Sequence, residues 1–131
     1  MSWDAARAAL DGRLLLLTGV DRTRIHWPNR AFDPSKIAAG LGYWKVDFIP
    51  ASVEPEMGPS GKAHEKGIYQ VSIFTPADSG LGPALQLAQA VVDHYQRQVL
   101  SGVACGVPRI GPYLVDPEWF HVPVSIPFQA L

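Results

Sequence analysis

Four histidines, one cysteine and two glutamates are the residues considered first, because their side chains could support metal, nucleophilic or acid–base chemistry. The histidines are His26, His64, His94 and His121. None has the H-x-x-x-H spacing with a carboxylate, or the nearby Cys-x-x-Cys, that a zinc site requires. His64 precedes Glu65, but a bare His-Glu dipeptide is far more often a solvated pair than a site. We therefore expect no metal and no cofactor.

Nucleophilic and carboxylate chemistry also lack a supporting pattern. Cys105 lies in a Val-Ala-Cys-Gly-Val run, without the cation or helix N-terminus that lowers a thiol pKa, so this pattern indicates a small core residue. Glu54 and Glu56 supply the two carboxylates of a glycosidase dyad, but such a dyad needs a fixed separation. This polar stretch offers no scaffold to fix it. G-x-S-x-G, P-loop and G-x-G-x-x-G motifs do not occur. We expect no catalytic residue and no enzyme.

Composition limits the possible classes further. A chain of 131 residues has the length of one domain, and we expect a single domain over residues 1–131. The formal net charge of −1 argues against a nucleic-acid partner. One cysteine excludes an internal disulfide and fits a reducing compartment. The N-terminus lacks the order of a signal peptide and Leu14–Leu17 is too short to cross a bilayer, so no membrane is expected.

Two strand-like runs, Tyr43–Pro50 and Gly67–Pro76, dominate the middle of the chain. Apolar and polar residues alternate along both. In the first run, Trp44, Val46 and Phe48 fall on one face. A period of two is typical of antiparallel strands with one face in water.

The stretch Ala51–Lys66 between these runs is polar, rich in glycine and proline, and much longer than a hairpin requires. Such a composition cannot bury enough surface to offset its ordering entropy, which predicts a long mobile loop at about residues 51–66. This stretch and the last strand supply the candidate contact residues, which are Glu54, Glu56, Lys62, His64, Glu65, Lys66 and His121.

Two amphipathic helices are predicted on either side of the central runs. One begins at a Ser2 cap, repeats apolar residues at steps of three and four as far as Leu17, and ends at Gly19. The other begins at Pro83 and carries an apolar stripe that includes Leu85 and Tyr95.

The last strand is predicted at Trp119–Phe128, where apolar residues alternate strongly with polar ones. Pro123 and Pro127 share one face, and two prolines indicate an edge strand that is blunted or pairs with another chain. Shorter strands are expected at Arg24–Trp27 and within Gly102–Ile110. This order of elements predicts an α+β fold, in which two main helices pack on an antiparallel sheet of four to five strands.

Six segments follow one another along nearly the whole chain: an N-terminal helix, Ile25–Pro34, the two central runs, a second helix, and Val122–Phe128. This order resembles the tail-terminator-like proteins of long-tailed bacteriophages and prophages. No single residue is diagnostic. The resemblance implies a tail-terminator-like fold and a non-enzymatic structural protein, which is found in the virion and, during assembly, in the host cytoplasm.

The resemblance also implies a hexameric ring that caps the tail tube, ends tail polymerisation and forms the head–tail joining surface. The partners would be further copies of the chain, the tail tube protein and a head-completion or connector protein. Subunits in such a ring make heterologous contacts, and an isolated subunit could be monomeric. Two alternatives remain open. One is a neck connector or tail-completion protein, and the other is a small α+β ligand-binding or enzymatic domain with polar groups converging in an apolar pocket.

Overall fold

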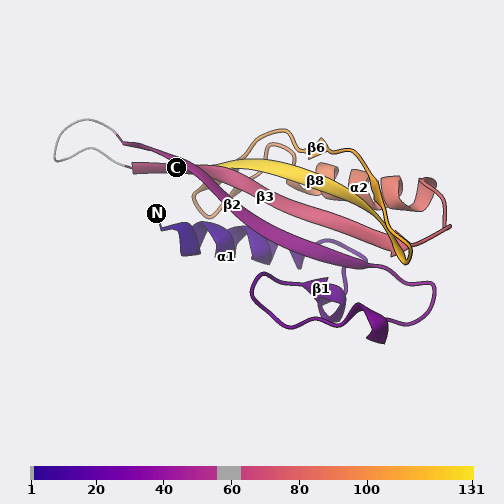
Figure 1. Cartoon of the computed structure of the whole chain (residues 1–131). Coiled ribbons are helices and arrows are strands. Elements are labelled where there is room, and N and C mark those ends of the chain that lie inside the picture. The colour runs from indigo at the N-terminus through magenta and orange to yellow at the C-terminus, as the bar shows by residue number, and fades with distance from the viewer. Residues whose placement is uncertain (1, 56–62) are drawn as a thin grey trace.

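The computed structural model describes residues 2–55 and 63–131, and Figure 1 shows the arrangement of their helices and strands. The elements follow in the order α1 (Trp3–Leu14), β1 (Ile25–His26), β2 (Tyr43–Pro55), β3 (Ala63–Pro76), α2 (Gly82–Tyr95), β4 (Val99–Leu100), β5 (Val103–Cys105), β6 (Arg109–Ile110), β7 (Leu114–Val115) and β8 (Trp119–Ala130). The predicted α+β class is confirmed.

One mixed sheet of eight strands holds the described residues together. Its order is β1-β2-β3-β8-β5-β4, and β6 and β7 also pair with β8. β1 is parallel to β2, whereas every other pairing is antiparallel. The prediction of a purely antiparallel sheet of four to five strands was therefore too simple. The extra strands are two or three residues long, which is too short for a period of two to appear in the sequence.

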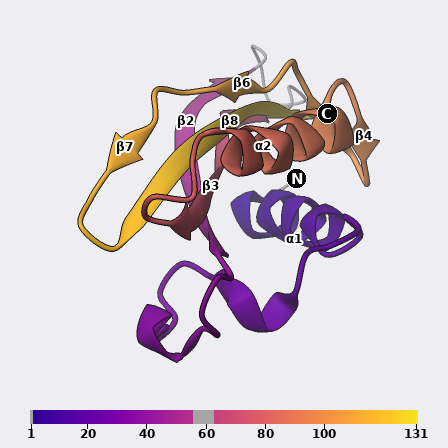
Figure 2. The ribbon, with the colours of Figure 1, turned by 90° about the vertical axis from the view of Figure 1, so that its right-hand side faces the viewer.

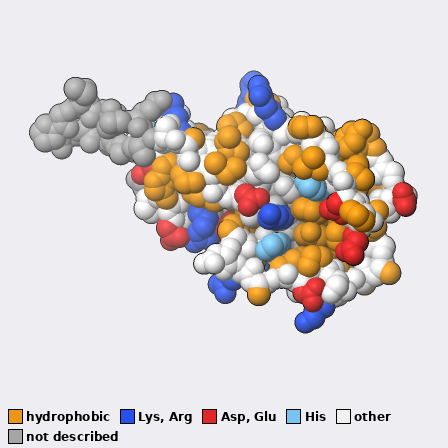
Figure 3. All heavy atoms as spheres, viewed as in Figure 1, with side chains coloured by type: hydrophobic (Ala, Val, Ile, Leu, Met, Phe, Trp, Pro, Cys, Tyr) orange, Lys and Arg blue, Asp and Glu red, His pale blue; other side chains and the backbone are white. Residues whose placement is uncertain are grey.

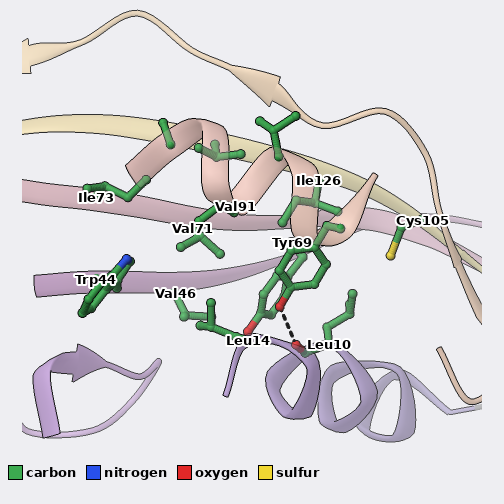
Figure 4. Close-up of a cluster of buried hydrophobic side chains, with 14 of the residues drawn as sticks. Leu10, Leu14, Trp44, Val46, Tyr69, Val71, Ile73, Val91, Cys105 and Ile126 are labelled. Carbon is green, nitrogen blue, oxygen red and sulfur yellow. Dashed lines mark hydrogen bonds between the residues drawn. The ribbon is translucent and has the colours of Figure 1, made fainter. Parts of the chain in front are cut away.

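Both α-helices lie on the same side of the sheet, so the other face carries no α-helix among the described residues (Figure 2). The core lies between the helices and the covered face. Figure 4 shows Tyr69 of β3 pointing toward α1, where Leu10 and Leu14 lie. These three side chains are fully buried. The covered face holds the apolar residues that the alternation predicted, including Val46 of β2.

The helices begin close to where the sequence placed them. The Ser2 hydroxyl accepts a hydrogen bond from the amide of Ala5 at 3.1 Å, which confirms the predicted cap of α1. α1 ends at Leu14, earlier than the expected Leu17. In α2 the expected stripe is rotated: Leu85 is 38% exposed, whereas Val91 is fully buried.

The β2–β3 hairpin is longer than predicted. Glu54 pairs with His64 and Ser52 pairs with Lys66, so the predicted loop over 51–66 is wrong at both of its ends. A register shift between Pro50 and Ser52 absorbs one residue, and backbone pairing then continues through a polar stretch that has no apolar alternation. Residues 56–62 lie outside the described part of the chain, so the mobility predicted for them stays a prediction.

β8 is not the edge strand that its prolines predicted, because β3 pairs with it along one side and β5, β6 and β7 along the other. The carbonyls of Pro127 and Pro123 accept hydrogen bonds from the amides of Gly106 and Gly111, both at 2.8 Å. The missing proline N–H groups therefore also point to this outer side. The ladder with β3 remains continuous, while the outer side is broken at each proline into short strands.

Candidate functional site

Two of the histidines and the cysteine, whose side chains could support chemistry, have structural contacts instead. The Nε2 atom of His94 lies 2.6 Å from the carbonyl of Arg13, whose guanidinium donates to the carbonyl of His94 at 2.9 Å, so this pair joins α1 to α2. The ring of His26 stacks on Phe32 at 5.1 Å. Burial raises the pKa of the Cys105 thiol to about 11, so the thiol is protonated near neutral pH.

No three His, Cys, Asp or Glu side chains among residues 2–55 and 63–131 are grouped closely enough to hold a metal ion. In the same residues, no helix is long and apolar enough to cross a membrane. Two hollows, of about 670 and 650 Å³, are open depressions beside the segment that joins α1 to β2. They are lined by charged residues of both signs, including Asp33 and Lys36 in one and Arg7 and Asp11 in the other.

The predicted contact residues fall into two separate places. Glu54, His64, Glu65 and Lys66 belong to the end of the β2–β3 hairpin, whereas His121 belongs to β8. Glu56 and Lys62 lie outside the described residues. We call the paired segments 52–55 and 63–66 the arm. β8 pairs with β3 only as far as Lys66, opposite Gln129, so the arm is two-stranded for most of its length and extends beyond the sheet (Figure 1).

Residues of the arm alternate between its two faces. His64 is half-buried, and its Nδ1 atom lies 3.4 Å from the carbonyl of Ala130. Lys66 is half-buried on the same face of β3. Glu65 points to the opposite face, which it shares with Tyr69, and it is only 9% exposed. One carboxylate oxygen of Glu65 is buried and has no hydrogen-bond partner among the described residues.

His121 takes part in a row of rings across the open face of the sheet. Its ring lies 4.5 Å from that of Phe74, which stacks on Tyr43 at 4.4 Å, and Tyr43 contacts Phe32 at 5.0 Å. Burial lowers the pKa of His121, and in the described part of the chain its buried Nδ1 atom has no hydrogen-bond partner. Figure 3 shows this face, where two histidines lie among hydrophobic and charged side chains.

The sequence analysis missed two features at the sheet edges. Within the described residues, β2 has a neighbouring strand on one side only over most of its length, because β1 pairs with just Trp44 and Lys45. On the far side of β8, a segment around β6 and β7 exposes large apolar side chains, namely those of Val107, Ile110, Tyr113, Leu114 and Val115. The sequence predicted a short strand only within Gly102–Ile110, since strands of two residues leave no pattern.

Comparisons with known proteins give a shared fold and a family. No curated protein matches the chain. Among the solved structures that match, one has a TM-score of 0.72 at 24% sequence identity, and the match covers 100% of this chain and 96% of that one, which shows a shared fold. The family model described as phage tail terminator protein matches residues 5–128. The chain therefore belongs to the phage tail terminator protein family.

Proposed function

We propose that this chain forms a homohexameric ring on the end of the phage tail tube, where it ends tube polymerisation and presents the surface that joins the head. Family membership supports the proposal, because it makes the chain a structural component of the phage tail and of the virion. The partners in this proposal are further copies of the chain, the tail tube protein and a head-completion or connector protein. Assembly would take place in the host cytoplasm.

The observation that carries the proposal is the arm. A two-stranded ribbon is at best marginally stable in water unless a third strand or a helix covers it. β8 pairs with β3 only up to Lys66, so beyond that point no third strand among the described residues pairs with the arm, although His64 and Glu65 still pack against their own subunit. Such a projection is accounted for by a contact with another molecule of the assembly.

The charges of the arm suit a polar contact. The described part carries Glu54, His64, Glu65 and Lys66, and residues 56–62 add Glu56 and Lys62. We assign these residues to the contact with the tail tube. His121, at the other end of the open face, is assigned to a contact between subunits or with the head.

A shortened arm tests this assignment. Glu54 pairs with His64, so replacing residues 55–63 by Asn-Gly would close the hairpin with a two-residue turn and leave the sheet intact. The variant would be supplied to a phage that lacks its own copy, and tail lengths would be measured by electron microscopy. We expect overlong or headless tails.

One result would decide against the proposal, and a control guards against a general defect. Tails of normal length that join heads at the normal frequency would show that the arm is not needed. The matched control substitutes Asp93, an exposed residue of α2, with Asn, and it is expected to give normal tails. Loss of function in this control as well would point to a general defect rather than to the arm.

A further inference from the structure

The free edge of β2 offers a place for another strand. β1 pairs with Trp44 and Lys45 only, so between Asp47 and Pro50 no described residue pairs with the outer side of β2. An uncovered strand edge presents unpaired N–H and C=O groups and is a template for pairing with another chain.

The direction of these groups follows from the registers. The carbonyl of Pro127 points away from β3, so the backbone groups of its neighbour Ile126 point toward β3 and toward Tyr69. Tyr69 thus bonds to β8, and the groups of Phe48, which lies opposite Tyr69 on β2, point out to the free edge. The backbone of Pro50, two residues after Phe48, also faces the free edge. The N–H that proline lacks would therefore not have donated a hydrogen bond to β3.

The opposite edge of the sheet has a matching site on β6. The backbone groups of Ser125 point to the outer side of β8, as the carbonyl of Pro127 does, and Ser125 pairs with Arg109. The backbone groups of Ile110, the next residue, therefore point out of the sheet, where no described strand pairs with them. The side chain of Ile110 is 38% exposed, beside the exposed Tyr113 and Leu114.

The strand directions fit a ring. β2, β3, β8 and β6 alternate in direction, so β6 is antiparallel to β2. When copies stand side by side in the same orientation, as cyclic symmetry requires, the β6 edge of one meets the β2 edge of the next in antiparallel fashion. Two copies related by a two-fold axis would instead join like edges.

The charges at the two edges are complementary. Asp47, Gln70, Ser125 and Arg109 form one row across the open face. Neither Asp47 nor Arg109 forms an ion pair within the described residues. If Ile110 of one copy lies opposite Phe48 of the next, Arg109 and Asp47 are diagonal neighbours at roughly 7–8 Å, which is within reach of long side chains.

We propose that neighbouring copies of this chain join edge to edge, with the free edge of β2 in one copy paired to the β6 edge of the next and Asp47 beside Arg109 across the seam. This inference rests on the proposed ring and names its subunit contact. Because the contact joins two different surfaces, it can be repeated around a ring.

Charge reversal at the seam tests the inference. Asp47→Arg and Arg109→Asp would each place like charges at every seam, so each variant alone is expected to lose the sixfold species in light scattering. The double variant restores opposite charges and is expected to assemble. A 1:1 mixture of the two single variants is also expected to assemble, because alternating subunits put opposite charges at every seam of an even-membered ring.

The controls separate the two proposals. Asp93→Arg reverses a charge on exposed helix surface and should leave assembly unchanged. Each variant would be measured alone and on tubes of the phage's own tail tube protein. If the wild-type chain forms rings and both single variants form them equally well, the seam is overturned while the ring stands. If the wild-type chain forms no ring under either condition, the proposed function fails, and the seam with it.

Discussion

The amide of Gly106 donates a hydrogen bond to the carbonyl of Pro127 at 2.8 Å, and the two residues are so close that a Cβ on residue 106 would lie 3.0 Å from the proline Cγ. Gly111 has the same relationship to Pro123, with the same two distances. At both positions the chain outside β8 passes over a proline ring at the place where the proline offers no donor. A Cβ at either position would require the proline ring to shift by a few tenths of an ångström.

Substitution of Gly106 by valine should destabilise the protein. The new side chain would meet Pro127 at a distance that few real contacts reach, and overpacking of this kind costs about 1–3 kcal/mol. Urea unfolding followed by circular dichroism should show a lower midpoint with an unchanged slope. Valine at residue 106 with wild-type stability would show that Pro127 moves aside at no cost.

A glycine with free space around it should respond in the opposite way. Gly12 lies in α1, and a Cβ there would have no atom within 4 Å. Alanine in a helix interior is favoured over glycine by roughly 0.5–1 kcal/mol, so Gly12→Ala should raise the free energy of unfolding by about that amount. The same urea titration measures it, and a decrease in stability would contradict the placement of Gly12 in α1.

The Tyr69 hydroxyl provides a third test. It donates a hydrogen bond of 2.5 Å to the Asp11 carboxylate, and the side chain of Tyr69 is fully buried. Arg7 holds the other oxygen of Asp11 at 2.7 Å. Tyr69→Phe should cost about 1–3 kcal/mol, since hydrogen bonds to charged groups are worth more than neutral ones. In a double-mutant cycle with Asp11→Asn, the two losses should be less than additive. Strict additivity would show that this bond contributes no coupling.

The raised pKa of the Cys105 thiol predicts how the free energy of unfolding changes with pH. Its pKa is about 11 in the folded protein against an ordinary value of 9.0, because burial disfavours the thiolate. The unfolded chain therefore loses its thiol proton first, and the stability that this group contributes is present below pH 9 and is lost as pH rises toward 11. Cys105→Ala should reduce the fall in unfolding free energy over that interval. An identical fall in both proteins would contradict the raised pKa.

The sequence predicted those parts of the fold that repeat over many residues. The alternation of β8 and the stripe of α1 each extend over several periods, so burial of Val124 and Leu10 was predictable. The prolines of β8 correctly marked missing donors. Which side of the strand lacked them depended on the register with β3, and no local pattern records a register.

The candidate contact surfaces show the same limit. Charged residues of the arm stood out in the sequence, whereas Phe48 and Ile110 matter for the direction of their backbone groups, which their residue types do not reveal. That direction became visible only through Pro127 and Gly106, on a different part of the sheet. Tertiary pairing thus supplied the edges that side-chain chemistry alone could not indicate.

Chemical cross-linking of thiols across the seam is the last prediction. Asp47→Cys with Arg109→Cys places the two thiols on different edges of one subunit, so only neighbouring copies can join them. Diagonal neighbours are too far apart for a direct disulfide, so the assembled rings would be treated with a short bis-maleimide, which can bridge roughly 7–8 Å. This reagent should give a ladder of covalent oligomers that ends at six in a denaturing gel. Each single cysteine variant is the matched control and should give no ladder, because the raised pKa of the buried Cys105 keeps that thiol unreactive. A product that stops at a dimer would indicate a two-fold contact between like edges and would overturn the head-to-tail seam.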